Sequence, residues 1–472
     1  MRRTPVTFTS HRRALTVAAG SIGLAIALSS CASAEESGAA SAENTAGQAV
    51  ASSEIDCSQF DEFGGKDALD GKEVEVYTTI VAPEDQPFID TFAPFTECTG
   101  ITVNYNGSKQ FEAQLPVRVQ SGDAPDIAFL PQPGLLQRMV ATGAVAEPPA
   151  SVTKNVDENW TAAWKEYGSV DGTFYAAPLG ANVKSFVWYS PKAFSDAGYE
   201  IPKTWDELIA LSDTMAADNP DVKPWCAGIG SDAATGWPAT DWLEDTVLRQ
   251  HGPDVYDQWI AHEIPFNDPR IVQSLDTVGQ VLKNEEYVNG GLGGVTSIAT
   301  TPFQDAGLPI LQGQCMMHRQ ASFYQANWPD GTTVAEDGDV FAFPFPEFSA
   351  EVGQGIVGGG EFVAAFNDEP ATQALQYYIS TSDWANLKAK ATGPGWFNAN
   401  KGLDLDNLSS PIDRLAAEQL QDDSVTFRFD ASDLMPAAIG SGAEWTQLTA
   451  WIAEGKSSQE VADAVEAAWP AS

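Results

Sequence analysis

The chain has 472 residues, of which 43% are hydrophobic and 19% charged, and its formal net charge is −40. A chain of this length exceeds one ordinary hydrophobic core, so we expect two or three domains. So acidic a surface repels phosphate backbones and anionic lipid headgroups, which excludes nucleic acid as a partner and limits membrane contact to an anchor. The acid excess is typical of a solubilising surface, and an acidic field that attracts a cationic ligand is the alternative.

Residues 1–30 have the layout of a secretory signal peptide. A basic segment, 1–13, precedes an uncharged and mostly apolar run, 14–28, which is shorter than the roughly 20 residues that span a bilayer. The run is followed by Ser-Ser-Cys31, which with the preceding Leu resembles the bacterial lipobox. A lipobox implies cleavage before Cys31 and lipidation of that cysteine. A plain signal peptide cleaved after Ala34 is the alternative.

Residues 31–56 consist mainly of Ala, Ser, Glu and Gly, with almost no large apolar side chain to bury. Such a composition predicts a disordered tether. A flexible coil of this length reaches about 25–30 Å on average. We therefore expect an extracytoplasmic body that a lipid holds at the outer face of the bacterial cell membrane.

From Lys72 onward, short β-rich runs alternate with helical stretches. Strands are predicted over 73–79, 101–105 and 126–130, and helices over 83–95, 111–119 and 135–140. This alternation is typical of an α/β sheet with parallel strands and helices on both faces.

Later helices have recognisable first turns and buried faces. The segments 204–207 and 457–460 both have the spacing of a capping box. One set of apolar residues repeats at helical spacing, namely Ile271, Leu275, Val278 and Leu282. Three tryptophans in helical patterns are expected in the core: Trp205, Trp445 and Trp451. The sequence has no repeat of 20–50 residues and no second apolar run of membrane-spanning length.

Four cysteines remain after the signal: Cys57, Cys98, Cys226 and Cys315. Outside the cytoplasm thiols oxidise, so an even number favours two disulfides, for which three pairings are possible. Neither CxxC nor His-x-x-x-His spacing occurs, so we predict no metal site, and nothing in the sequence indicates a cofactor.

Four segments in order resemble the extracellular solute-binding proteins of carbohydrate importers, the group that includes maltose-binding protein. The first is the Ser-Gly-Asp-Ala-Pro-Asp-Ile run at 121–127. The second is Gly-Thr-Phe-Tyr-Ala-Ala-Pro at 172–178, continued over 188–208. The third covers 313–328, and the fourth is the Gly-Gly-Gly-Glu-Phe-Val-Ala-Ala run at 358–365. Each segment alone is a weak signal, but four in one order behind a lipobox make the resemblance specific.

The resemblance implies an α/β, two-lobed periplasmic-binding-protein-like fold with a hinge and a ligand cleft between the lobes. Lobe one is expected over 57–180 and 319–366, and lobe two over 182–317 and 367–472. Each disulfide would then fall within one lobe if Cys57 pairs with Cys98 and Cys226 with Cys315. Ligand contacts from both lobes favour the closed state, which the transmembrane subunits of an ABC importer detect. We expect the protein to act as a monomer.

Sugars offer apolar faces that stack on aromatic rings and hydroxyl rims that bond to polar side chains. The chain has 14 tryptophans, and four that lie in loop-like surroundings or near the start of a helix are the predicted stacking residues: Trp237, Trp242, Trp328 and Trp396. For each, sealing a loop against the core is the alternative. Further ligand contacts are predicted at Thr78, Asp126, Gln132, Asn182, Asp241, Phe323, Glu361 and Arg428, although capping is an equal explanation for Asp126.

The predicted ligand is an oligosaccharide, first an α-linked di- or trisaccharide of glucose. No catalytic residue is predicted, because the sequence contains no Gly-x-Ser-x-Gly, HExxH or P-loop motif. A secreted glycan-active enzyme would need two placed carboxyl groups, and 65 acidic residues make such a pair impossible to recognise from sequence. A binding protein of the same fold for a cationic ligand such as a polyamine remains the other alternative.

Overall fold

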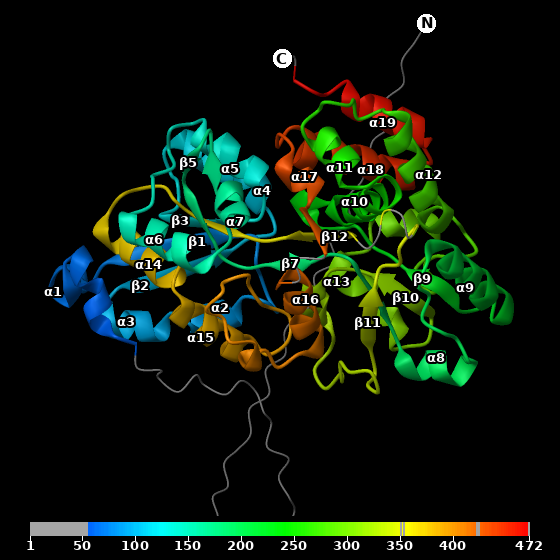
Figure 1. Cartoon of the computed structure of the whole chain (residues 1–472), viewed down its shortest axis with the longest axis horizontal. Helices are drawn as coiled ribbons and strands as arrows, with labels where there is room; N and C mark the ends of the chain where they lie inside the picture. The colour runs from blue at the N-terminus through cyan, green and yellow to red at the C-terminus, as the bar shows by residue number, and fades with distance from the viewer. Residues whose placement is uncertain (1–54, 350–351, 353–354, 422–424, 471–472) are drawn as a thin grey trace, which may run out of the picture. The chain divides into compact units, whose positions relative to one another are not determined.

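The computed structural model describes residues 55–349, 352, 355–421 and 425–470, which belong to one compact unit, Gly47–Ser472. The predicted signal peptide, Cys31 and nearly all of the predicted tether lie outside the described residues. Helices and strands alternate along the described chain, and its elements can be followed from blue to red in Figure 1. Within these ranges, no helix combines the length and apolar character needed to cross a bilayer.

The first sheet has five strands in the order β2-β1-β3-β13-β6. They are β2 (Thr102–Gly107), β1 (Glu73–Thr78), β3 (Ile127–Leu130), β13 (Phe362–Ala365) and β6 (Ala176–Pro178). β1 runs parallel to β2 and β3, whereas β13 is antiparallel to both β3 and β6. The predicted strands near residues 73, 101 and 126 are therefore present, and they are the described strands of this sheet that pair in parallel.

Helices α4 (Phe111–Ser121) and α5 (Pro133–Val140) follow β2 and β3 as predicted. The single helix expected over 83–95 is instead two short helices, α2 (Gln86–Asp90) and α3 (Ala93–Thr99). Each of them carries a proline in its first two positions. Because proline has no amide hydrogen and crowds the preceding turn, Pro94 begins a new helix rather than extending the first.

Two helices from late in the chain also pack in this region: α14 (Pro370–Ile379) contacts β1 and β13 of the sheet, and α15 (Ser382–Thr392) packs on α2. Tyr378 of α14 stacks on Phe95, with ring centroids 5.4 Å apart, and Trp384 of α15 lies 6.3 Å from Phe88. This packing differs from the expected division, which placed everything after residue 366 in lobe two. The buried face of α14 is apolar, and the first sheet is the surface that covers it.

The second sheet has the order β11-β8-β10-β9. Its strands are β11 (Phe341–Pro344), β8 (Phe186–Tyr189), β10 (Cys315–Arg319) and β9 (Lys223–Cys226). Around it pack α9 (Trp205–Asp218), α10 (Trp237–His251), α11 (Pro253–Ile260), α12 (Pro269–Leu282), α18 (Trp445–Ala453) and α19 (Ser458–Glu466). β11 was expected in lobe one, but it pairs with β8 of this sheet. Phe343 of β11 and Phe345, the residue after the strand, are buried in the hydrophobic core around this sheet.

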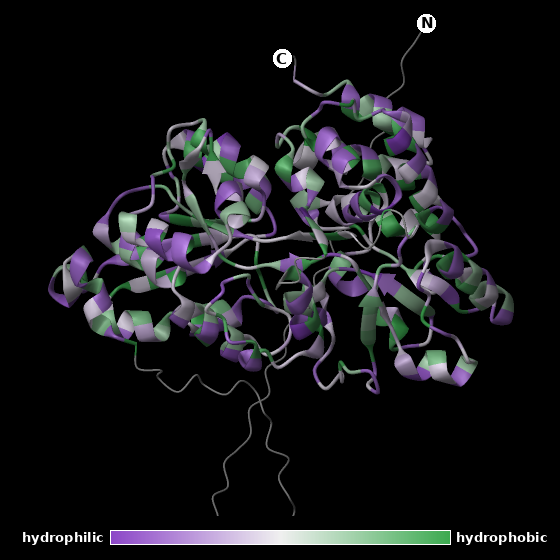
Figure 2. Cartoon of the chain, in the orientation of Figure 1, coloured by the Kyte–Doolittle hydropathy of each residue, from purple (hydrophilic) through white to green (hydrophobic). Residues whose placement is uncertain are grey.

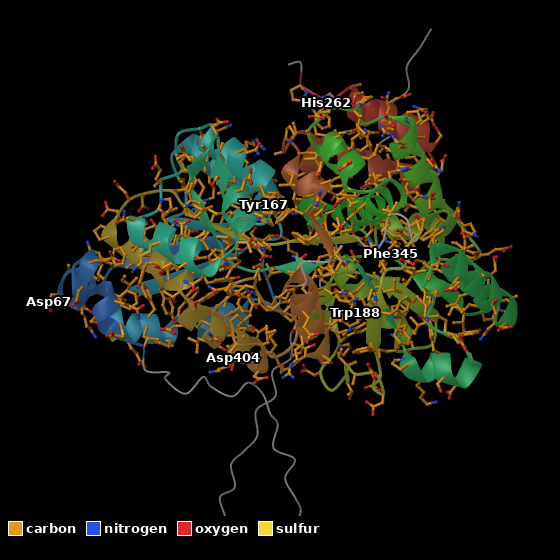
Figure 3. All side chains as sticks on the ribbon, viewed as in Figure 1. Asp67, Tyr167, Trp188, His262, Phe345 and Asp404 are labelled. Carbon is orange, nitrogen blue, oxygen red and sulfur yellow. A yellow bond between two sulfur atoms is a disulfide. The ribbon has the colours of Figure 1, made fainter. Side chains whose placement is uncertain are left out.

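Several local predictions about these helices are confirmed. Both capping boxes form, Thr204 with Glu207 at the start of α9 and Ser457 with Glu460 at the start of α19. The predicted apolar face of α12 is buried, with Ile271, Leu275, Val278 and Leu282 each at most 1% exposed. Hydrophilic and hydrophobic residues alternate along the helices of Figure 2, as one buried face requires. Trp188 and Phe345 are buried, whereas Asp67 and Asp404 lie at the periphery (Figure 3).

A third sheet has the strand order β14-β12-β7. Along the chain, β7 and β12 each lie between a strand of the first sheet and a strand of the second. β7 (Asn182–Val183) connects β6 of the first sheet to β8 of the second, and β12 (Gly355–Gly359) leads into β13. β14 (Thr426–Phe429) pairs with β12 in parallel. β7 lies beside the crossing expected near residues 180–182, and the other two strands of this sheet lie at 355–359 and 426–429, away from the crossings expected near 318–319 and 366–367.

The cysteines pair as expected if each disulfide falls within one lobe. Cys57 is bonded to Cys98, which ties the 3-10 helix η1 (Cys57–Phe63) to α3. Cys226 is bonded to Cys315, which joins the neighbouring strands β9 and β10. Each disulfide therefore lies within one of two packed regions, which consist of the first or the second sheet and the helices around it.

Candidate ligand-binding site

A cavity of about 490 Å³ lies where segments from the three sheets meet. Its lining comes from the segments after β1 and β3, the first turns of α4 and α10, strand β7, the turn between β12 and β13, and the segments around Trp396 and after β14. The carboxyl ends of parallel strands are where ligands usually bind in α/β folds, and β1 and β3 both end there. The volume is within the usual range of small-molecule sites.

One wall of the cavity is a group of three aromatic side chains, Trp237, Phe303 and Phe323. The Trp237 ring centroid lies 5.0 Å from that of Phe303 and 6.0 Å from that of Phe323. Trp237 is the first residue of α10, and the preceding Gly236 has a φ of +119°, where a side chain would collide with the Trp445 backbone. This tight turn presents the partly exposed indole to the cavity.

Trp396 and Phe88 belong to another part of the lining. The ammonium group of Lys388, which is fully buried, lies 4.7 Å from the Trp396 ring centroid and 3.9 Å from that of Phe88. Two carboxyl groups of the lining, Glu84 and Glu361, are near this lysine, and burial raises the pKa of Glu84 to about 7. Aromatic rings therefore border the cavity on two sets of segments.

Several buried polar atoms beside the cavity lack a hydrogen-bond partner within the part of the chain that the structure describes. They are Glu112 Oε2, Gln132 Oε1, Asn182 Oδ1, Trp396 Nε1 and Trp445 Nε1. An unpartnered buried polar group costs about 1–3 kcal/mol, and a ligand in the cavity would be a source of partners for these atoms. Burial also raises the pKa of Glu112 to about 7.

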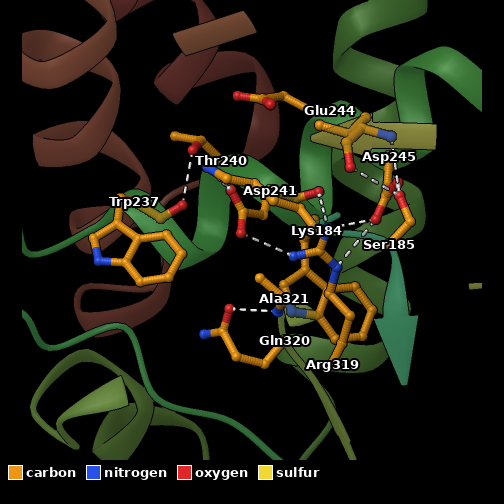
Figure 4. A network of polar contacts seen from close by, with 12 residues as sticks. Lys184, Ser185, Trp237, Thr240, Asp241, Glu244, Asp245, Arg319, Gln320 and Ala321 are labelled. Atoms are coloured by element: carbon orange, nitrogen blue, oxygen red, sulfur yellow. Dashed lines mark hydrogen bonds and ion pairs between the residues drawn. The ribbon is translucent and has the colours of Figure 1, made fainter. Parts of the chain in front are cut away.

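The floor of the cavity is a buried ion cluster around Lys184 (Figure 4). The Lys184 ammonium lies 3.1 Å from Asp241 Oδ1, donates to Asp430, and is 3.9 Å from Asp433 Oδ2. Burial opposes the charge of Lys184, but these carboxylates outweigh it and raise its pKa well above the ordinary value. Glu244 lies close to Asp241 and Asp430. Lys184 thus supplies positive charge within a group of acids.

The ion cluster continues along α10 from Asp241 to Asp245 and Arg249. Arg319 of β10 pairs with Asp241 at 3.1 Å and also with Asp245, which further binds Arg249 and accepts a hydrogen bond from Ser185. Burial opposes ionisation of Asp245, yet the two arginines lower its pKa. These bonds connect α10 to β10 and to Ser185, the residue before β8, so the cluster holds the floor to the second sheet.

The structure places some of the predicted ligand contacts at the cavity and others elsewhere. Those that line it are Trp237, Trp396, Gln132, Asn182, Phe323 and Glu361. Those that do not are Trp242, Trp328, Thr78, Asp126, Asp241 and Arg428.

Both tryptophans outside the cavity lining pack in hydrophobic surroundings. Trp242 contacts Trp225 and Phe345, with centroids 5.3 and 5.6 Å away. Trp328 lies against Trp188 and Tyr324. They are 3% and 7% exposed, respectively, so the sealing role that was their alternative matches their positions.

The polar residues outside the lining have partners within the protein. Thr78 Oγ1 accepts from the Ile80 amide, and the next residue, Thr79, lines the cavity instead. Asp126, at the amino end of β3, accepts from the Glu75 amide at 2.7 Å. Asp241 pairs within the ion cluster described above. Arg428 makes a bidentate pair with Asp257 at 2.6 and 2.8 Å.

Several lining residues were not predicted from sequence: Glu112, Lys184, Phe303, Asp430 and Trp445. Glu112 lies in the first turn of the helix that follows β2, and Asp430 directly follows β14. A position just after a strand was therefore the sequence signal that could have identified both residues. Trp445 was expected in the core; it is only 3% exposed but also borders the cavity. Lys184 and Phe303 had no distinguishing local pattern.

Residues 77–385 match the family model of the bacterial extracellular solute-binding proteins. The chain belongs to this family. Among curated relatives, the osmoprotective compounds-binding protein GgtB of Synechocystis sp. is 38% identical over 409 residues, covering 85% of this chain and 93% of that protein. The alpha-glucosides-binding periplasmic protein AglE of Rhizobium meliloti is 37% identical over 427 residues, covering 88% and 91%.

Solved structures of solute-binding proteins have the same fold. The bacterial solute receptor AcbH superposes with a TM-score of 0.71 at 20% identity, covering 84% of this chain and 98% of that one. Maltose-bound MalE3 of T. maritima gives 0.67 at 15% identity, with 84% and 98% covered. The predicted two-lobed α/β fold is therefore confirmed, and this solute-binding protein has its cavity between segments of both packed regions.

Proposed function

We propose that the cavity captures an oligosaccharide of the α-glucoside class and that the protein delivers it to an ABC importer. The observation that carries this proposal is the combination of an aromatic wall with unpartnered buried acceptors at one cavity. The wall of Trp237, Phe303 and Phe323 suits the apolar face of a pyranose ring. The acceptors Gln132 Oε1, Asn182 Oδ1 and Glu112 Oε2 suit sugar hydroxyls, which donate hydrogen bonds.

The name of one relative supports the same ligand class. The relative from Rhizobium meliloti is named for binding alpha-glucosides. The cavity volume of about 490 Å³ accommodates a short saccharide rather than a polymer. We propose a di- or trisaccharide.

The protein acts as an extracytoplasmic monomer without catalytic activity, and Cys31 carries the lipid that anchors it. The family consists of extracellular solute-binding proteins. The lipid anchor follows from the lipobox-like run that ends at Cys31. Expression of the full chain with Cys31→Ala in a bacterial host should release the protein from the membrane fraction, and retention there would contradict the anchor.

A thermal-shift screen tests the ligand class directly. Trehalose, sucrose, maltose and maltotriose are compared with glucose, galactose and spermidine on the mature protein. At a hundredfold excess over Kd, a ligand stabilises by about 2.7 kcal/mol, which raises Tm by several degrees. A rise with at least one α-glucoside, and recovery of that sugar unchanged, is expected. No shift with any saccharide, or hydrolysis of the bound one, would refute the proposal.

A cationic ligand is the second candidate, favoured by the acid excess of the lining. The lining carries Glu84, Glu112, Asp232, Glu361, Asp430 and Asp433, against Lys109 and Lys184. Lys184 is already paired with two of these acids. Binding of a cation such as spermidine should weaken strongly between 50 mM and 500 mM NaCl, whereas binding of a neutral sugar should change little.

A further inference from the structure

Asp413 is a buried carboxyl group that lies behind the cavity and forms no part of its lining. It belongs to the first turn of α16 (Pro411–Gln421). Its Oδ2 accepts a hydrogen bond from the Gly395 amide at 2.9 Å, and its Oδ1 accepts one from Gln325 Nε2 at 2.6 Å. Gly395 immediately precedes Trp396, and Gln325 is two residues beyond Phe323. One carboxyl group therefore joins the two segments that carry these rings.

The two ring-bearing segments have few other backbone attachments near the cavity. The Trp396 segment bonds to the crossing strand region through the Ala181 amide and the Phe397 carbonyl, at 3.0 Å. The Phe323 segment, the 3-10 helix η5 (Ser322–Asn327), bonds to the same region through the Val183 amide and Ser322 Oγ, at 3.2 Å. Asn398 Nδ2 also donates to the Leu179 carbonyl, and Tyr324 Oη accepts from the Gly307 amide and donates to the Gln304 carbonyl. The bonds of Asp413 differ from these because one carboxyl group holds both segments at once.

The Trp396 and Phe323 segments also touch directly. Gly395 has a φ of +111°, and a Cβ added there would lie 2.9 Å from the Ala326 Cβ. Such an approach is possible only for glycine, and it holds only while the two backbones keep their spacing. A change in the bonds of Asp413 would therefore be transmitted to the rings.

The donors around Asp413 are oriented so that position 413 must accept. Ser410 Oγ donates to Gln325 Oε1, and Gln325 Nε2 also donates to the Ser322 carbonyl at 2.9 Å. The Gln325 amide is thus fixed with its NH2 group toward Asp413, and the Gly395 amide can only donate. An NH2 group at position 413 would face one of these two donors.

We propose that Asp413 is a positioning residue of the ligand cavity, which sets the places of Trp396 and Phe323 without touching the ligand. This inference rests on the proposed saccharide binding. It extends that function to a residue that neither the lining of the cavity nor the sequence pattern singles out.

Asp413→Asn is the first test, because it keeps the shape of the side chain and replaces one acceptor with a donor. The Kd for the saccharide with the largest thermal shift, measured by calorimetry, should rise about tenfold. In protein labelled with 5-fluorotryptophan, the Trp396 resonance, assigned with Trp396→Phe, should shift or broaden in the variant without any ligand. A folded variant with an unchanged Trp396 resonance and an unchanged Kd would overturn the proposal.

The double variant Asp413→Asn/Gln325→Glu exchanges the amide and the carboxylate. The new amide oxygen accepts from Gly395, its NH2 donates to the new carboxylate, and that carboxylate still accepts from Ser410, although it loses the bond that Gln325 donates to the Ser322 carbonyl. The reference is therefore Gln325→Glu alone: adding Asp413→Asn to it should tighten saccharide binding about tenfold and move the Trp396 resonance back toward its wild-type position. Failure of this rescue in a folded protein would contradict a role through these two bonds.

Ser212→Ala is the matched control, because it removes one buried hydrogen bond, from Trp225 Nε1 to Ser212 Oγ at 3.0 Å, between two residues that do not line the cavity. It should lower Tm and leave both Kd and the Trp396 resonance unchanged. If Asp413→Asn does not fold, Gln325→Met removes only one of the two bonds, and a Kd and resonance equal to wild type would then overturn the proposal. If wild type binds no saccharide, the proposed function fails, whereas the fluorine spectra still decide whether Asp413 positions Trp396.

Discussion

Buried polar groups in the floor of the cavity are ion-paired within the chain, whereas some of those in its walls have no partner among the described residues. In the floor, Lys184 pairs with Asp241 and Asp430, and Asp241 also pairs with Arg319. In the walls, Gln132 Oε1 and Asn182 Oδ1 are buried without a partner among the residues described. Groups that are paired within the chain hold the fold, whereas unpaired groups at a cavity are suited to a partner that the ligand supplies. Asp241 Oδ2 has no geometrically good hydrogen bond either, but Lys184 and Arg319 form ion pairs with its carboxylate, whereas nothing in the described chain pairs with Gln132 Oε1.

Breaking the floor should have the largest effect. Lys184→Met leaves Asp241 and Asp430 buried beside one less positive charge, and removing one partner of such a buried pair costs about 3–5 kcal/mol. Urea unfolding monitored by circular dichroism measures the loss. Lys192→Met is the control, since Lys192 pairs with Asp196 at the exposed surface and should change stability by less than about 1 kcal/mol. An equally small loss of unfolding free energy in both variants would show that the buried cluster contributes no more than a surface ion pair.

Trp237 and Trp242 test the same contrast for aromatic residues. Trp237→Ala should weaken saccharide binding by about 1–3 kcal/mol, or roughly tenfold to a hundredfold, because it removes a ring that borders the cavity. Trp242→Ala should instead destabilise the fold by about 3–5 kcal/mol, because it empties a core position. Calorimetry and urea unfolding on both variants distinguish the two results. A normal Kd in a folded Trp237→Ala protein would remove Trp237 from the site.

Removal of a wall acceptor should affect binding more than folding. Gln132→Leu deletes an unpartnered buried oxygen, so the free energy of unfolding should stay equal or rise slightly. Saccharide affinity should fall by about 1 kcal/mol, close to fivefold, because one ligand hydroxyl loses its acceptor. Stability that falls as far as affinity would instead assign Gln132 to the fold.

The last expected effect is a pH dependence of stability from Glu112. Burial raises its pKa to about 7 from an ordinary value of 4.5, so the folded protein holds this proton more tightly than the unfolded chain. Its contribution to stability is therefore fully present below pH 4.5 and is lost as the pH rises to about 7. Glu112→Gln should match wild type near pH 4 and exceed its Tm by about 2–4 °C at pH 8. An equal Tm at both pH values would contradict this.

Local patterns predicted much of the fold. The two capping boxes, the apolar face of α12 and the first three strands each depend on residues within a few positions of one another. The division between the packed regions could not be predicted in the same way. Where α14 and β11 pack is decided by which distant surface can cover Leu375 or Phe343, and no short pattern encodes that.

The sequence by itself determined the family, the strand and helix order, the number of available cysteines and the kinds of side chain suited to a sugar. Only the tertiary structure decided which of them meet at the cavity. Trp237 and Trp242 lie five positions apart on α10, and at 3.6 residues per turn they face directions about 140° apart. One ring therefore borders the cavity and the other fills the core, because the surroundings of a helix, not its sequence, decide what each face meets.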